Sequence, residues 1–217
     1  MKKTALMFLL MGISFCVYAQ NGVIKEVSGT VELIRAGEIA YVPARAGDTV
    51  SENTVISTSF RSTAIVEIGG TTIHVQPITR LTLTEIRALE NAETLQVNLR
   101  AGSVRVDVTP PAGTRANTRV QSPAASASVR GTSFYFDTRN IHVTQGTVLF
   151  NGSRGYTVQV NAGSGTAVER NGTASAPQYI SGYQDSNPVG WDPSAATAGG
   201  TGAVLSEPNS VDVGVEY

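Results

Sequence analysis

The sequence predicts an all-β fold: a compact β-solenoid-like or β-sandwich domain of short strands, followed by a disordered C-terminal tail. Apolar and polar residues alternate along many segments, as they do where one face of a strand is buried and the other faces water. Turn dipeptides such as Gly69-Gly70 and Asn151-Gly152 interrupt these segments at intervals of roughly eight to twelve residues. Helical periodicity is scarce, so no helical layer is expected.

Residues 1–19 are typical of a secretory signal peptide. Two lysines supply the positive start, and the apolar run that follows is too short to cross a bilayer comfortably. Small residues precede a cleavage site that we place between Ala19 and Gln20. We therefore expect a periplasmic or secreted protein, with a retained N-terminal anchor as the alternative. Lipidation of Cys16 is disfavoured by the large Phe15 before it.

Composition limits the class of partner. The chain has 16 basic and 17 acidic residues, and removal of the two signal-peptide lysines leaves 14 against 17, a formal charge of −3. Nucleic acids require a basic field, so no nucleic-acid partner is expected. Cleavage also removes the single cysteine, which excludes disulfides and thiolate metal sites from the mature chain.

Residues 20–170 form the predicted folded domain. Residues 84–95 (TEIRALENAETL) are an exception to its strand pattern, because Ile86, Leu89 and Ala92 fall roughly on one side of a helix. We interpret this segment as a loop or a single helical turn. The clearest strand alternation runs through residues 73–75, 81–83, 104–108, 134–136 and 141–143.

A weak internal sequence repeat, which we call the internal echo, indicates the architecture of the domain. Glycine permits a sharp corner, after which the chain enters a strand. Repeated corners favour a chain that winds through short rungs, so a β-solenoid is preferred and a β-sandwich is the alternative. The echo is a glycine next to small residues and then a strand, in residues 28–33, 101–106, 145–150 and 164–169.

Residues 171–217 differ in character from the rest of the chain. They are rich in Gly, Ser, Ala, Pro and Asn, and they carry five acids but no lysine or arginine. So few apolar residues do not offset the entropy of ordering, and we expect a largely disordered acidic tail. Trp191 is a candidate docking motif in this tail, with an incidental aromatic residue as the alternative. The final residues 211–217 (VDVGVEY) are a candidate edge strand.

No catalytic constellation stands out from the sequence. The mature chain has two histidines, His74 and His142, each on the polar face of an alternating segment. An exposed or hydrogen-bonded strand histidine is more common there than a catalytic base. The sequence also lacks hydrolase, zinc-protease, phosphate-loop and calcium-loop motifs. We therefore expect no enzyme, no cofactor and no metal.

Residues 122–136 (SPAASASVRGTSFYF) test this expectation, because their serines are candidate nucleophiles. The small residues 124–128 let a strand lie close against a neighbouring layer, and Gly131 permits a positive φ or a close backbone approach. Arg130 and Thr132 are expected to bond groups at the corner, and Phe134 to fill the core. On this interpretation the serines are packing and corner residues.

The same segment also resembles the core of the FecR domain, "V-x-T-P-x-A … V-R-G-T-x-F". Ser122 takes the place of the usual threonine. Other fragments follow in the family's order, and the resemblance covers about residues 22–160. The motif residues are Ser122, Pro123, Val129, Arg130, Gly131, Thr132 and Phe134; the other fragments are residues 46–48, 56–58, 64–70, 81–83, 99–104 and 145–148.

The resemblance implies an all-β, solenoid-like extracytoplasmic module that works by contact with other proteins. In the founding regulators this module relays the state of a TonB-dependent outer-membrane transporter to a sigma factor. This chain has a signal peptide where those regulators have a cytoplasmic sigma-binding segment and a membrane helix. We therefore expect a non-enzymatic module that binds an unidentified envelope protein, in signalling or assembly, without direct control of a sigma factor.

An alternative function is a structural or adhesive surface module that binds cell wall or polysaccharide. Weak association with the cell wall or the outer membrane is compatible with either function. Few aromatic residues are available in the domain to stack on sugar rings, so the protein-binding function is preferred.

Overall fold

The computed structural model describes residues 21–89 and 91–180. The sequence predictions for the signal peptide, its cleavage site at Ala19 and Gln20, Cys16, Trp191 and residues 211–217 lie outside the described residues. Within them the structure contains strands and no helix, so the predicted all-β fold is confirmed.

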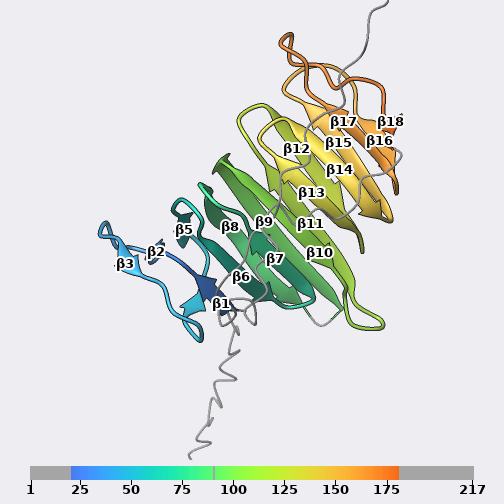
Figure 1. Ribbon diagram of the computed structural model, residues 1–217. Helices are drawn as coiled ribbons and strands as arrows, with labels where there is room; N and C mark the ends of the chain where they lie inside the picture. Colours follow the sequence, from blue (N-terminus) through green and yellow to red (C-terminus); the bar gives the residue numbers. More distant parts are fainter. Residues whose placement is uncertain (1–20, 90, 181–217) are drawn as a thin grey trace, which may run out of the picture. The chain divides into compact units, whose positions relative to one another are not determined.

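Two sheets of nine strands each make up the fold (Figure 1). Sheet A contains, in spatial order, β18 (Gln178–Tyr179), β17 (Ser164–Ala167), β14 (Asn140–Gln145), β13 (Ser133–Asp137), β10 (Ser103–Val108), β7 (Thr71–Val75), β6 (Thr63–Ile68), β1 (Gly22–Ser28) and β4 (Thr49–Val50). Sheet B contains β16 (Val158–Asn161), β15 (Thr147–Gly152), β12 (Ala125–Val129), β11 (Arg115–Gln121), β9 (Ala92–Ala101), β8 (Arg80–Leu89), β5 (Val55–Thr58), β2 (Val31–Ile34) and β3 (Val42–Pro43).

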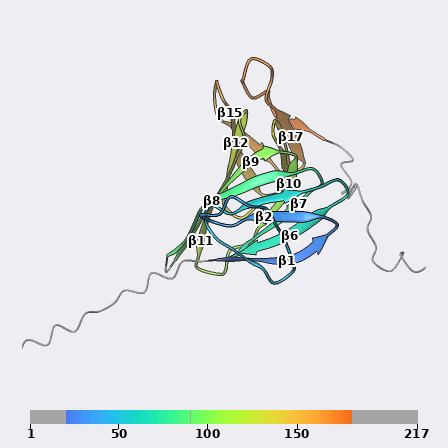
Figure 2. The ribbon, with the colours of Figure 1, turned by 90° about the vertical axis from the view of Figure 1, so that its left-hand side faces the viewer.

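The chain passes back and forth between the two sheets while it advances along both. It forms the hairpin β6–β7 in sheet A, then β8–β9 in sheet B, and later β11–β12 in sheet B and β13–β14 in sheet A. Neighbouring strands are antiparallel except for β9 and β11, which are parallel. The two facing layers are those of a sandwich, and the steady advance of the chain accounts for its solenoid-like sequence pattern (Figure 2).

The core lies between the sheets and is built from the inward residue of each alternating pair. Val104, Val106 and Val108 point inward from β10. The rings of Phe136 in sheet A and Phe150 in sheet B meet edge to face, with centroids 6.3 Å apart. Each such buried side chain contributes roughly 1.5–3 kcal/mol relative to an exposed one, so this seam is a main source of stability.

Most glycines of the internal echo lie where the chain crosses from one sheet to the other. Gly29 joins β1 to β2, Gly102 joins β9 to β10, and Gly146 joins β14 to β15, all with positive φ. The fourth, Gly165, lies inside β17. The expected corners are therefore found at three of the four positions.

Gly102 shows most clearly why such a corner needs glycine. Its φ is 83°, and a Cβ there would lie 2.2 Å from Oγ1 and 2.5 Å from Cα of Thr79. Thr79 cannot move aside, because its buried hydroxyl donates to the carbonyl of Ser103 and accepts from the amide of Ser103, both at 3.0 Å. A side chain at Gly102 would thus break the bonds that close the crossing.

The sequence prediction for residues 84–95 is wrong. This segment forms the end of the β8–β9 hairpin, in which Leu89 pairs with Ala92. A bulge between Leu83 and Glu85 shifts the strand phase, so the buried residues Leu83 and Ile86 stand three positions apart. That spacing imitates the period of a helix.

The ordered domain also extends beyond residue 170, where the sequence analysis places its end. Val168 bridges to Ala174, and β18 pairs with β17 through Tyr179 and Gln178. The residues of β18 are exposed, so backbone pairing holds this strand without the apolar pattern that a sequence reveals. Tyr179 is therefore a sheet residue and not part of a tail.

Candidate functional site

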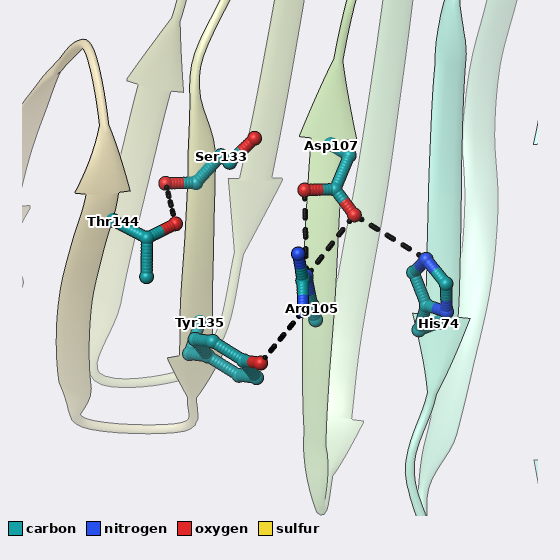
Figure 3. Close-up of polar contacts among 6 residues, drawn as sticks. All are labelled: His74, Arg105, Asp107, Ser133, Tyr135 and Thr144. Atoms are coloured by element: carbon teal, nitrogen blue, oxygen red, sulfur yellow. Dashed lines mark hydrogen bonds and ion pairs between the residues drawn. The ribbon is translucent and has the colours of Figure 1, made fainter. Parts of the chain in front are cut away.

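The outer face of sheet A carries a cluster of polar side chains from three neighbouring strands (Figure 3). Strand pairing places Arg105 opposite both His74 and Tyr135, and Asp107 opposite Ser133. Oδ2 of Asp107 lies 3.3 Å from Nε2 of His74 and accepts a hydrogen bond of 3.1 Å from Nε of Arg105. Nη1 of Arg105 donates to the Tyr135 hydroxyl at 3.0 Å. The cluster therefore holds its charges in fixed places.

Opposing effects act on the pKa of Asp107. Burial raises it, but hydrogen bonds from His74 and Ser133 and the positive charge of Arg105 outweigh burial, so the pKa lies below its ordinary value of 3.8. The carboxylate consequently stays ionised except in acid.

The cluster has the residue types of a hydrolase triad in an order that does not support catalysis. In a triad the imidazole lies between the hydroxyl and the carboxylate, so that it can take the hydroxyl proton. Here the carboxylate of Asp107 stands between His74 and Ser133. The Ser133 backbone carbonyl is bonded separately, since it accepts a hydrogen bond of 2.9 Å from Thr144 Oγ1. This geometry presents a charged surface and provides no proton relay.

His142 does not lie on an open polar face, in contrast to the sequence prediction. Its side chain is buried, with 8% of the residue exposed, and burial lowers its pKa from the ordinary 6.5. It pairs with Gly165, and the absent side chain of this glycine leaves room for Ile180, whose Cδ1 lies 2.7 Å from where a Cβ would stand. The C-terminal end of the described chain thus covers this part of sheet A.

A second feature, on the outer face of sheet B, is a groove of about 440 Å³ that is open to solvent. Its centre is a row of side chains across four paired strands: Asn98 on β9, Gln121 on β11, Ser126 on β12 and Asn151 on β15. The hydroxyl of Ser126 donates to Oδ1 of Asn151 at 2.5 Å. Arg100 follows Asn98 on the outward side of β9 and lines the same groove.

The small residues of the segment 122–136 contribute to both sides of sheet B. Ala125 and Ala127 point inward and are buried, as packing against the other layer requires. Ser126 and Ser128 point outward and are partly exposed. The small size of Ser126 is what leaves the floor of the groove low, so this segment shapes a surface as well as the core.

Ser122 fixes the turn that enters β12. Its Oγ donates to the carbonyl of Thr138 at 2.6 Å and accepts from the amides of Ala124 and Ala125 at 3.3 and 3.0 Å. The hydroxyl is thus fully engaged by the backbone, and Pro123 beside it is exposed at the rim of the groove.

The other motif residues lie at the crossing from β12 to β13. Val129 and Phe134 are buried in the core, and Gly131 has a φ of 75°. Thr132 does not make the predicted bond: its Oγ1 is buried without a hydrogen-bond partner among the described residues. Arg130 is exposed, and its side chain makes no hydrogen bond or ion pair with that part of the chain, so the predicted bond at the corner is not found.

Sequence reasoning singled out Ser122 and Pro123, which line the groove, but it missed four other lining residues. Asn98, Arg100, Gln121 and Asn151 come from three strands far apart in sequence, and only the strand register brings them together. The parallel pairing of β9 with β11 is especially hard to foresee, because no short turn joins the two strands. The available signal is the set of polar residues at the outward positions of alternating segments.

Neither a metal centre nor a membrane-crossing helix is found in the described ranges. Residues 21–89 and 91–180 contain no group of three or more His, Cys, Asp or Glu side chains that is placed to hold a metal ion. The same residues include no helix with the length and hydrophobicity that crossing a bilayer requires.

Comparison with known proteins gives a family match over the middle of the fold. Two crystal structures, at 2.50 and 1.65 Å, of a protein provisionally assigned as an anti-sigma factor from Parabacteroides distasonis ATCC 8503 are similar to this chain. Each is 18% identical with a TM-score of 0.47, and the match covers 58% of this chain and 59% of that chain. No curated protein matches. Residues 54–149 match the family described as FecR protein, so the FecR resemblance predicted from the sequence is confirmed over this part of the chain.

Proposed function

We propose that this chain is a non-enzymatic, extracytoplasmic FecR-type module that binds another protein of the cell envelope, in signalling or assembly. The observation that carries the proposal is the combination of a FecR domain with outer sheet faces whose polar groups are held in fixed positions. Preorganised groups of this kind favour recognition, because little side-chain freedom is lost on binding.

The arrangement of the histidines supports a binding role over catalysis. His74 is paired with the Asp107 carboxylate, which also accepts a hydrogen bond from Arg105. His142 is buried. A general base needs a reachable proton on a substrate, and neither imidazole has the geometry for that.

The extracytoplasmic location rests on the sequence of residues 1–19. Fractionation of cells that make the protein, with determination of the N-terminal residue of the mature form, tests it. We expect a periplasmic or secreted product that begins at Gln20, and a cytoplasmic product that retains residue 1 would contradict the assignment.

Affinity capture of the full-length chain after crosslinking of intact cells tests the binding function. We expect reproducible recovery of one discrete envelope protein. Recovery of no protein, together with co-sedimentation of the purified chain with isolated cell wall, would instead favour the structural or adhesive function.

A further inference from the structure

The groove on sheet B is hollow because the side chains in its central row differ in length. Asn98, Gln121 and Asn151 carry amide side chains, whereas Ser126 between the last two is short. Gly152 also lines the groove, and a Cβ there would lie 2.2 Å from the carbonyl oxygen of Gly172. The low floor flanked by amides is therefore built into the paired strands.

The lining is suited to hydrogen bonding with a polypeptide backbone. Each amide side chain both donates and accepts, as the N–H and C=O groups of an extended peptide require. Ala124 and Ser126, which line the groove, are small and allow a main chain to approach the sheet closely. No aromatic residue lines the groove, so the stacking surface that sugar rings use is absent from it.

The charge of the groove indicates which kind of peptide would fit it. Arg100 lines the groove with an exposed side chain that makes no hydrogen bond or ion pair with the described residues. No aspartate or glutamate lines the groove. A guanidinium that has no partner among the described residues and lies beside a neutral hydrogen-bonding surface matches a carboxylate, which it can bind through two parallel hydrogen bonds.

We propose that this groove binds an extended segment of a partner protein that carries an acidic side chain, with the carboxylate on Arg100 and the backbone along Asn98, Gln121 and Asn151. The inference rests on the proposed protein-binding function and names the chemistry of the segment that is bound.

Fluorescence anisotropy with the full mature chain tests the charge preference. One labelled probe is a short unstructured peptide in which glutamate alternates with serine, and the second has glutamine in place of each glutamate. We expect the acidic peptide to bind at least about tenfold more tightly, the effect of one charged hydrogen-bonded pair. Arg100→Gln should abolish this preference, while Arg119→Gln, at another exposed arginine of sheet B outside the groove, should retain it.

A second pair of variants tests the position without changing any charge. Ser126→Tyr fills the floor of the groove and should lower the affinity for the acidic peptide at least about tenfold, whereas Ser128→Tyr lies on the same face of β12 outside the groove and should not. Both substitutions suit the outer face of a strand, and equal melting temperatures would verify that both variants fold.

Several results would overturn the inference. They are equal binding of the two peptides by the wild-type chain, equal losses in Arg100→Gln and Arg119→Gln, or full affinity in Ser126→Tyr. If wild type, Arg100→Gln and Ser126→Tyr capture the same envelope protein equally well from crosslinked cells, the groove inference fails and the proposed function stands. If wild type captures none, the proposed function itself fails.

Discussion

The role of a side chain in this molecule depends on which face of a strand it occupies. Inward residues such as Val104 and Phe134 hold the sheets together, and outward residues such as Arg105 and Asp107 are bonded to their neighbours across the strands. Asp107 and His142, two titratable groups of sheet A, have pKa values below their ordinary ones. Their shifts make separate predictions about pH.

Asp107→Asn should destabilise the domain by about 1 kcal/mol at pH 7, because His74 and Arg105 lose the charge that they bind. The folded pKa of Asp107 lies below 3.8, so its contribution is present above that pH and is lost as the pH falls toward the folded pKa. Urea denaturation at several pH values should show the gap between wild type and variant narrowing in acid. An equal gap at neutral and strongly acidic pH would contradict this role.

His142 should make the domain less stable as the pH falls through 6.5. Burial lowers its folded pKa, so the unfolded chain binds a proton more readily and protonation favours unfolding. His142→Gln should remove this part of the pH dependence, which thermal denaturation at pH 7.5 and 5 would measure. A wild-type stability that rises over this range, or a variant with the same pH dependence as wild type, would count against it.

At the scale of strands and crossings, the sequence predicts some features well and others poorly. Alternation identifies strands such as β7, β10 and β13, because each has one buried face. It fails around Thr84, where a bulge changes the phase, and at β18, where backbone pairing acts without buried side chains. The groove depends on strand register, including one parallel pairing, and alternation in a single strand carries no information on register.

The crossings supply a prediction at this scale, since two glycines with similar φ differ in their surroundings. A Cβ added at Gly131 would have only the Cδ of Pro110 near it, at 4.0 Å, whereas one at Gly102 would meet the Thr79 side chain and backbone. Gly131→Ala should therefore cost about 1 kcal/mol from backbone strain alone. Gly102→Ala should cost on the order of 2 kcal/mol or more, because strain and a steric clash add. Chemical denaturation would measure both, and equal losses would refute the assignment of Gly102 as a sterically closed crossing.

Over the whole molecule, the two sheets form one continuous core and present two outer faces of different character. The outer face of sheet A carries the charged cluster around Asp107, and that of sheet B carries the amide-lined groove. The C-terminal end of the described chain belongs to this fold, because Thr166 donates to the carbonyl of Ser175 at 2.6 Å and β18 extends sheet A.

Two truncations test where the folded unit ends. Removal of residues 175–217 takes away the Ser175 carbonyl, β18 and the apolar cover that Ile180 gives to Gly165. It should lower the melting temperature relative to removal of residues 182–217, which leaves all of these in place. Identical melting temperatures for the two truncated chains would show that β18 adds nothing to stability.

The most direct measurement of the central claim is site-specific photocrosslinking from the outer faces in cells that make the protein. A photoreactive residue is placed singly at outward positions of each sheet, including Ser126 in the groove and Tyr135 in the charged cluster. A module that works by protein contact should give one discrete adduct with another protein from at least one face. The absence of an adduct from every outward position, with the protein correctly exported and folded, would contradict it.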